Sequence, residues 1–318
     1  MSSQAPGLMV IVGPTAAGKS AHALDLCEAV GGEIISADSV QVYRGLDVGS
    51  AKPTAEERAR VVHHGIDLVD ISETMDAARW IRAAESAIDD CHRRGSLPVV
   101  CGGTGMYVRG LVWGMAEIPE IPSAVRLGVR EEIAEEGAET LHGQLALVDP
   151  EAASRIGPRD AQRIGRALEV YRATGRSLSA WQQDGRERPP RWRAEIAGLW
   201  PEREALYQRI DQRVGRMFRD GWTEEVEALL SGGASPQAPG LQTLGYRDVV
   251  AAVQGGDVAA ADLATRIATG HRNYARRQLT WFRRMEREGN LARLHGSEDT
   301  VDRALQEMAK RCSRGGEG

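Results

Sequence analysis

Residues 7–20, GLMVIVGPTAAGKS, decide the fold of this chain. The apolar run Gly7–Val12 predicts a buried strand, and residues 20–30 have the apolar spacing of a helix. Between them, GPTAAGKS fits the P-loop pattern G-x-x-x-x-G-K-[ST], with the strand before it and the helix after it. In such a loop, backbone N–H groups and the helix N-terminus point at phosphate oxygens. The stretch therefore predicts a site for a diphosphate or triphosphate, but it names no reaction.

The whole motif is predicted to contact the phosphates: Gly13, Pro14, Thr15, Ala16, Ala17, Gly18, Lys19 and Ser20. Lys19 supplies a full positive charge, and the Ser20 hydroxyl is the predicted ligand of Mg²⁺, the one cofactor that we expect. A glycine-rich turn that matches the pattern by chance is the alternative, and the flanking strand and helix argue against it.

Short apolar strands alternate with helices around this motif. Residues 33–36 and 97–101 predict further buried strands, and residues 80–94 predict an amphipathic helix between them. The alternation predicts an α/β fold, here a P-loop NTPase-like core whose parallel sheet is flanked by helices. Another strand is expected at residues 196–200, with mainly helices after it.

The pattern changes at Ile118, where IPEIPS marks a boundary. Helical stretches then run to about Trp181, and residues 186–193 predict a loop broken by prolines. We expect residues 1–118 to form the first part of the core, residues 119–185 an inserted all-helical domain, and residues 186–318 the rest of the core with basic C-terminal helices. The final RGGEG is expected to be disordered.

The composition narrows the class of protein. With 42% hydrophobic and 27% charged residues, the 318-residue chain is typical of globular proteins. No apolar run approaches the ~20 residues of a membrane span, so we expect no membrane partner. The four cysteines have no paired spacing, which argues against a disulfide framework and a zinc site. We therefore expect the protein in the reducing cytoplasm. A net charge of −5 excludes a uniformly basic coat but not a local basic face. We expect a monomer.

Asp38 follows the second strand, and in a parallel sheet it would lie beside the P-loop. There it would act as a base or ligate Mg²⁺ through water; an aspartate that merely caps a turn is the alternative. Asp67 and Asp70 are possible substitutes for the metal-binding acid of P-loop ATPases, because the strand at 97–101 ends in Cys-Gly-Gly instead. This weak second acid argues against ATP hydrolysis. Lys52 is interpreted either as a phosphate or RNA contact or as a solvated surface lysine.

An arginine-rich stretch lies near the C-terminal end of the chain. Between Asp262 and Glu286 no acidic residue occurs, and six arginines are interleaved with aromatic residues. This composition is typical of a surface that binds RNA, but a solvated helix face with its aromatic residues in the core is an equal alternative. Arg213, one helical turn after Arg209, would close over a phosphate opposite the P-loop, unless it forms a surface salt bridge.

Several motifs together resemble one family. GPTAAGKS, ADSVQVYRGLDVGSAKP, GGTGMYVRGL, TLGYRDV and YARRQLTWFRR occur in the order found in bacterial tRNA dimethylallyltransferases, and the match spans about residues 8–285. Ser20 and Ser50 stand where threonine is common, and neither departure removes a needed group. The resemblance implies transfer of a dimethylallyl group from dimethylallyl diphosphate to N6 of adenosine 37, in tRNAs that read codons beginning with U. The products would be N6-(dimethylallyl)adenosine and diphosphate, and the RNA partner would be the anticodon stem-loop.

The resemblance also implies roles for individual residues. Asp38 would be the base, because the adenine amine is a poor nucleophile, and Arg213 would neutralise the leaving diphosphate. The inserted domain would grip the tRNA. The implied tRNA-binding residues are Asp38, Ser39, Val40, Gln41, Thr104, Arg126, Gln162, Arg163, Ile164, Gly165, Arg166, Gln242, Thr243, Leu244, Gly245, Tyr246, Arg247, Arg276, Arg277, Gln278, Leu279, Thr280, Trp281, Phe282 and Arg283.

Three other functions stay open at this point. A P-loop kinase would consume ATP, whereas the transferase would need none. An adenylate isopentenyltransferase would act on free AMP or ADP, and the arginine-rich C-terminal region favours a polymeric RNA instead. A non-catalytic RNA-binding module would have no use for a complete P-loop and Asp38.

Overall fold

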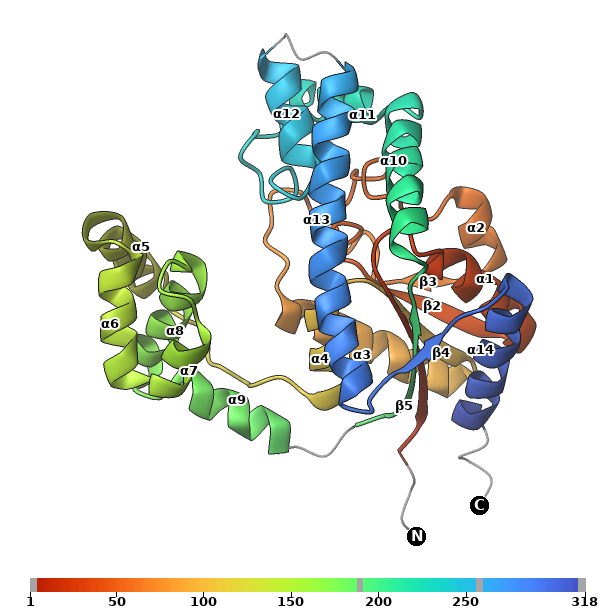
Figure 1. Cartoon of the computed structure of the whole chain (residues 1–318), viewed down its shortest axis with the longest axis horizontal. Coiled ribbons are helices and arrows are strands. Elements are labelled where there is room, and N and C mark those ends of the chain that lie inside the picture. Colours follow the sequence, from red (N-terminus) through yellow and green to blue (C-terminus); the bar gives the residue numbers. More distant parts are fainter. Residues whose placement is uncertain (1–4, 188–190, 256–259, 314–318) are drawn as a thin grey trace. The chain divides into compact units, whose positions relative to one another are not determined.

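The computed structural model of the protein describes residues 5–187, 191–255 and 260–313. The chain divides into two compact units (Figure 1). One unit combines Met1–Val112 with Arg191–Gly318, and the other is Trp113–Pro190, inserted into the first. The insertion was expected over residues 119–185, so its limits in the structure lie a few residues further out at both ends.

A parallel sheet forms the centre of the first unit, which confirms the predicted α/β core. Its strand order is β3-β2-β4-β1-β5-β6, and every pair of neighbours runs parallel. The strands are β1 (Gly7–Val12), β2 (Gly32–Ala37), β3 (His63–His64), β4 (Leu97–Gly102), β5 (Arg193–Leu199) and β6 (Ala292–Leu294). Val12 pairs with Gly102 on one side and Gly198 on the other, so the central strands end level and the loops that follow them meet at one edge.

Helices cover both faces of this sheet. Among them α1 (Lys19–Val30), α3 (Ala77–Arg94) and α14 (Glu298–Ser313) pack against the strands. The other helices of this unit are α2 (Ala55–Arg60), α4 (Gly105–Trp113), α10 (Arg203–Arg219), α11 (Trp222–Ser231), α12 (Tyr246–Gly255) and α13 (Ala260–Arg287). Leu24 of α1 and Leu305 of α14 pack in one core cluster with Ile11 of β1. At α3, the buried Trp80 stacks on Tyr107 of α4 at 4.6 Å between ring centroids and donates its indole N–H to the Ser36 carbonyl at 3.0 Å.

The inserted unit consists of helices throughout its described part. They are α5 (Ser123–Glu136), α6 (Ala138–Val148), α7 (Pro150–Arg155), α8 (Ala161–Thr174) and α9 (Leu178–Glu187). Val129, Leu141 and Ile164 are fully buried in a core of the unit's own. Asp149 is also buried in this unit. Its carboxylate caps α7 at the Ala152 N–H and accepts a second hydrogen bond from the Ser179 N–H. Burial of this carboxylate is tolerated because both oxygens are hydrogen-bonded.

A few local predictions differ from the structure. Strands β3 and β6 were not predicted, because two or three residues are too short to show a pattern. The predicted loop at 186–193 is shorter, since α9 reaches Glu187 and β5 begins at Arg193, while residues 188–190 and the RGGEG tail lie outside the described residues. Among the described helices, none has the length and apolar character to cross a membrane. The four cysteines are free and buried.

Candidate active site

The P-loop joins β1 to α1 at the edge where the central strands end. Ala16 and Gly18 have left-handed backbone angles, with φ of 62° and 91°, which turn the loop back toward the start of α1. Gly13 passes close to β5, and a Cβ there would collide with the Leu199 carbonyl oxygen. The loop is thus shaped by its own backbone and by the neighbouring strand.

Gln278 of α13 holds this loop from the other side. Its Oε1 accepts a hydrogen bond from the Thr15 N–H at 2.9 Å, and its Nε2 donates to the Gly103 carbonyl at 2.9 Å. The side chain is buried, and its amide is committed to these two backbone groups. Gln278 therefore positions the P-loop, and its contact with tRNA stays a prediction.

Two partly buried cations face the cavity beside the P-loop. Lys19 donates to the Pro14 carbonyl at 2.8 Å, and burial, with a contribution from Arg213, lowers the pKa of Lys19 to about 8. Arg213 of α10 is placed in the same cavity, and burial lowers its pKa as well. Its Nε has no hydrogen-bond partner among the described residues. Partly buried cations with incomplete partners are a physical reason for an anion to bind here.

Two cavities meet at this edge of the sheet. The first is lined by P-loop residues, including Lys19 and Ser20, and the second by the loops around Ser39, Gly49 and Thr243. Four residues line both cavities: Thr15, Asp38, Arg213 and Tyr274. Ligands in the two cavities would therefore meet at Asp38 and Arg213.

Asp38 caps a turn and also lines both cavities. Its Oδ1 accepts hydrogen bonds from the N–H groups of Val40 at 2.8 Å and Gln41 at 3.3 Å, which is the capped turn of the alternative interpretation. The same carboxylate lines both cavities, as the catalytic interpretation requires. Tyr274 lies next to it, hydrogen-bonded to Thr104 and Ser39, and burial together with Asp38 raises the pKa of the Tyr274 hydroxyl.

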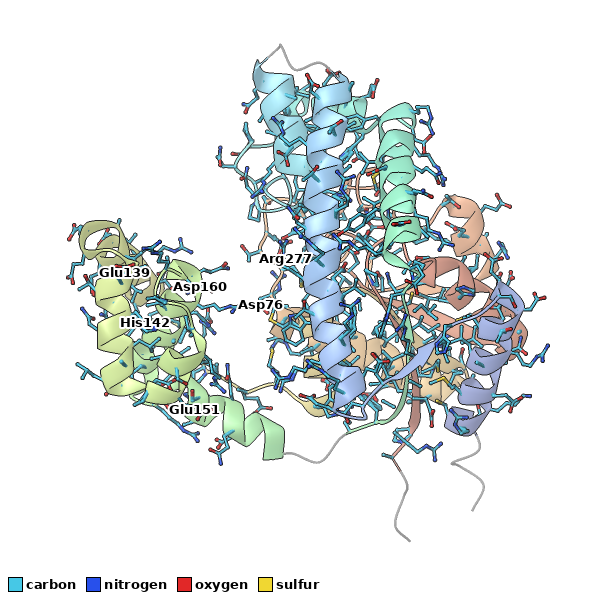
Figure 2. The ribbon with its side chains drawn as sticks, viewed as in Figure 1. Asp76, Glu139, His142, Glu151, Asp160 and Arg277 are labelled. Carbon is cyan, nitrogen blue, oxygen red and sulfur yellow. The ribbon has the colours of Figure 1, made fainter. Side chains whose placement is uncertain are left out.

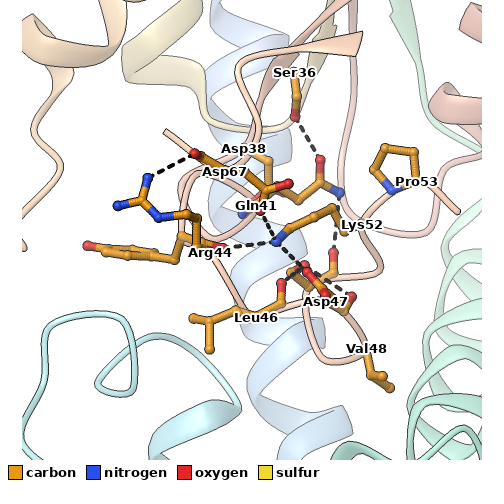
Figure 3. A network of polar contacts seen from close by, with 12 residues as sticks. Ser36, Asp38, Gln41, Arg44, Leu46, Asp47, Val48, Lys52, Pro53 and Asp67 are labelled. Carbon is orange, nitrogen blue, oxygen red and sulfur yellow. Dashed lines mark hydrogen bonds and ion pairs between the residues drawn. The ribbon is translucent and has the colours of Figure 1, made fainter. Parts of the chain in front are cut away.

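The loop after Asp38 is held by Gln41. The Gln41 Nε2 donates to the Ala51 carbonyl at 3.0 Å, and its Oε1 accepts from the Ser36 hydroxyl at 2.8 Å (Figure 3). Gln41 was expected to contact tRNA. In the structure its amide closes the loop that carries Asp38, because both ends of the amide are bonded within the protein.

Lys52 is the centre of a second network in this loop (Figure 3). Its side chain is 1% exposed, and its Nζ contacts the Asp67 carboxylate at 2.7 Å, the Tyr43 carbonyl at 2.9 Å and the Asp47 carboxylate. Both interpretations of Lys52 were wrong, since it is neither solvated nor in a cavity. Asp67 is used here and by Arg58, so it does not replace the metal-binding acid.

Asp70 is no substitute for that acid either. Its carboxylate accepts hydrogen bonds from the N–H and the hydroxyl of Ser72, and it does not line the P-loop cavity. The carboxylates that do line this cavity are Asp38 and Glu57. Glu57 is bonded to the Thr54 N–H in the capping box of α2, which leaves Asp38 as the carboxylate available to a ligand.

The predicted tRNA-binding residues are divided between the two units of the chain, and they differ in exposure. Arg126 and residues 162–166 belong to the inserted unit, and the others belong to the first unit. Exposed members are Arg126, Gln162, Arg163, Arg166, Gln242, Arg247, Arg276, Arg277, Thr280, Trp281 and Arg283. Buried members are Ile164, Gly165, Gly245, Tyr246, Gln278 and Phe282. The buried residues pack inside the fold and hold the exposed ones; Tyr246, for example, donates its hydroxyl to Glu225 at 2.6 Å.

Helix α13 has an exposed basic face, as an RNA-binding surface requires, and also aromatic residues that pack in the core. Phe282 is fully buried, whereas Trp281 is 39% exposed. Arg276 and Arg277 are exposed and have no ion-pair partner in the described part of the chain (Figure 2 labels Arg277). Other arginines are neutralised, as Arg272 is by Asp211. A short basic stretch of α13 is therefore open to phosphates.

The sequence interpretation missed the inward face of α13. His271, Tyr274 and Gln278 line the cavities and are spaced by three and four residues. Residues with that spacing share one helix face, so the helical period was a signal that could have grouped them.

Comparison with known proteins identifies the family. The IPP transferase family profile matches residues 41–285, which is more than half of the chain. The chain belongs to the IPP transferase family. The isopentenyl transferase profile also matches residues 6–74. The chain is 45% identical to the tRNA dimethylallyltransferase of Geobacter metallireducens, over 87% of this chain and 89% of that relative.

Solved structures agree with this assignment. The full-length tRNA isopentenylpyrophosphate transferase of Bacillus halodurans is similar with a TM-score of 0.69 and 33% identity, over 97% of this chain and 98% of that one. A eukaryotic dimethylallyltransferase acting on tRNA gives a TM-score of 0.80 and 27% identity, over 94% of this chain and 78% of that one. The resemblance inferred from the motifs is confirmed.

Replacing Lys52 by Met should lower the free energy of unfolding by ~2 kcal/mol, because the Tyr43 carbonyl and Asp47 would lose their partner and Asp67 would keep only Arg58. Urea denaturation measures this change. The control is Lys310→Met, which removes an exposed pair with Glu307 and should cost less than ~1 kcal/mol. Equal losses in both variants would show that the Lys52 network does not stabilise the loop.

The lowered pKa of Lys19 predicts how the affinity for inorganic diphosphate depends on pH. Below pH 8 Lys19 is charged, and above it the charge is lost, so affinity should fall about tenfold between pH 8 and 9.5, the equivalent of ~1.4 kcal/mol. Calorimetry on Lys19→Arg, which stays charged, corrects for titration of diphosphate itself. A parallel fall in both proteins would contradict the assignment.

Proposed function

We propose that this protein transfers a dimethylallyl group from dimethylallyl diphosphate to the N6 amine of adenosine 37 in tRNAs that read codons beginning with U. The observation that carries the proposal is the position of Asp38 on the wall shared by the two cavities. One cavity has the groups that bind a diphosphate, and the other is open to a second substrate. The names of the relatives support a tRNA as that second substrate.

The diphosphate is bound in the first cavity. The P-loop N–H groups, Lys19 and Arg213 surround its oxygens, and their positive charge stabilises the electrons that the leaving group takes when the allylic C–O bond breaks. The oxygen donors Ser20 and Asp38 suit Mg²⁺; Ser20, with phosphate oxygens and water, would hold the ion, which would add positive charge at the leaving group.

The adenine enters the second cavity. Its amine lone pair is delocalised into the ring, so N6 attacks the allylic carbon efficiently only if its proton is removed. The Asp38 carboxylate takes that proton as the N–C bond forms and the C–O bond breaks. The base has to leave the stack of the anticodon loop to reach Asp38, as in other enzymes that modify bases.

The RNA is held outside the cavities. Arg276 and Arg277 on α13 present charge that no protein carboxylate neutralises within the described residues, and Trp281 adds an exposed ring for stacking. In the inserted unit, Arg126, Arg163 and Arg166 are exposed, and we assign the grip on the anticodon arm to them. Both cavities are formed by one unit of one chain, which supports a monomer as the active form. The tRNA named for the relatives supports the cytoplasm as the place of the reaction.

Mass spectrometry tests the reaction. An anticodon stem-loop incubated with the enzyme, Mg²⁺ and dimethylallyl diphosphate should gain one C5H8 unit on its adenine, without ATP, whereas AMP should stay unmodified. Asp38→Asn keeps the Oδ1 acceptor of the turn but removes the base, so turnover should fall ~10²–10⁴-fold while stem-loop binding persists. Near-normal turnover of Asp38→Asn would reject Asp38 as the base. Equal reaction of AMP and the stem-loop would reject tRNA as the specific substrate.

Substituting Arg276 and Arg277 by Ala together should weaken stem-loop binding and reduce the slope of log affinity against log salt by roughly two, because each phosphate contact contributes about one. Fluorescence anisotropy at several salt concentrations measures the slope. Arg303→Ala, an exposed arginine of α14, is the control and should leave the slope unchanged. An unchanged slope in the double variant would exclude this stretch of α13 from phosphate contact.

A further inference from the structure

Three side chains with metal-binding atoms meet where β2, β3 and α3 come together, and the reaction above uses none of them. They are Glu33 of β2, His64 of β3 and Cys91 of α3. The His64 Nε2 lies 2.7 Å from the Glu33 Oε2, and the Cys91 Sγ lies 3.7 Å from the same oxygen. The three ligand atoms all lie within 4.8 Å of one another. The fold thus brings together three residues that lie far apart in the chain.

The chemistry of these three groups suits a zinc ion. Carboxylate, imidazole and thiolate are the ligands that Zn²⁺ takes in proteins, at bond lengths that place the ligand atoms of a tetrahedral site roughly 3.5 Å apart. The observed separations from Oε2, 2.7 and 3.7 Å, lie on either side of that value. Because a carboxylate only accepts hydrogen bonds, the imidazole and the thiol each direct a hydrogen at Oε2. A metal ion would replace these two hydrogens.

Charge and burial also favour an ion here. Cys91 is fully buried and the Glu33 side chain is 8% exposed, whereas the His64 side chain is 24% exposed and opens the site to solvent. One thiolate and one carboxylate cancel the charge of Zn²⁺, so the loaded site is neutral and its burial costs little. Zinc is therefore favoured over a monovalent cation, which would leave a net negative charge in a buried place.

Arg94 supports the carboxylate from its other side. It bonds the Glu33 Oε1, and its Nη2 also contacts the Asp90 carboxylate at 2.7 Å. Arg94 is 45% exposed and shares its charge with Asp90, so Glu33 can direct Oε2 at a metal while Oε1 stays bonded to the guanidinium. Outer partners of this kind orient the ligands of metal sites.

We propose that Glu33, His64 and Cys91 form a Zn²⁺ site, with a water as the fourth ligand, that fastens β3 to β2 and α3. This inference does not rest on the proposed function. Strand β3 has two residues and pairs with β2 only through His63 and His64, so it has few backbone bonds of its own. His63 and its partner Ile34 line the first cavity, and the ion would therefore support one wall of that cavity.

Cobalt is the probe that tests this site. Co²⁺ occupies zinc sites, and a thiolate ligand gives it an intense charge-transfer band in the near ultraviolet. The full-length protein, without a histidine tag and freed of metals by a chelator, should bind one Co²⁺ ion with this band, and one equivalent of Zn²⁺ should abolish the band. Zn²⁺ should also raise the midpoint of thermal unfolding, because it binds the folded chain preferentially.

Matched variants locate the bound ion. Cys91→Ser should lose the charge-transfer band, and Cys91→Ser and His64→Gln should each lower the affinity for Zn²⁺ at least about tenfold in competition with a chromogenic chelator. Cys101→Ser is the control, because Cys101 is also a free, buried cysteine but lines the first cavity beside Lys19 and Asp38. It should keep both the band and the affinity.

Several results would overturn the inference. They are a wild type without a thiolate band, zinc binding weaker than micromolar, a band that persists in Cys91→Ser, a band that is lost in Cys101→Ser, and bound zinc that leaves the unfolding midpoint unchanged. Circular dichroism of the metal-free variants checks that they are folded, and if Cys91→Ser is not, the affinity of His64→Gln decides. None of these measurements involves tRNA or dimethylallyl diphosphate, so the proposed function can fail without affecting them.

Discussion

The architecture of the site depends on an excess of positive charge in the cavity beside the P-loop. Lys19 and Arg213 are both partly buried, and the available carboxylate beside them is Asp38. Such an arrangement is unfavourable without an anion, so the protein holds the two cations apart on different elements, α1 and α10. A strongly anionic ligand in this cavity would relieve the imbalance.

The groups that keep this arrangement in place lie far from one another in the chain. Gln278 bonds Thr15 across 263 residues, and Glu225 bonds the Asp47 and Val48 N–H groups across more than 170. These contacts join α13 and α11 to the loops at the edge of the sheet. The core strands supply the level edge, and the long-range side-chain bonds determine which loop conformations face the cavities.

The same distinction explains what could be predicted from the sequence. Strands β1, β2 and β4 are short apolar runs that end next to glycine or a polar residue, so local pattern located them within a residue or so. The P-loop and Asp38 were placed correctly because parallel strands end at one edge. Lys52 was misinterpreted, and the hydrogen bonds by which Gln41 and Gln278 hold their loops were not foreseen, since the partners are contributed by other segments that periodicity does not reveal. Motif likeness also assigned Tyr246 and Phe282 to RNA contact although both are buried, because a motif includes the residues that pack behind a surface.

The length of helix α13 determines how precisely the groups that line the two cavities are spaced. It spans 28 residues, or about 42 Å at 1.5 Å per residue, and its inward face contributes His271, Tyr274 and Gln278 in turn. A residue that holds the P-loop and residues that line the second cavity thus belong to one continuous helix. Their mutual spacing is set by the helical repeat and does not depend on the conformation of the surrounding loops.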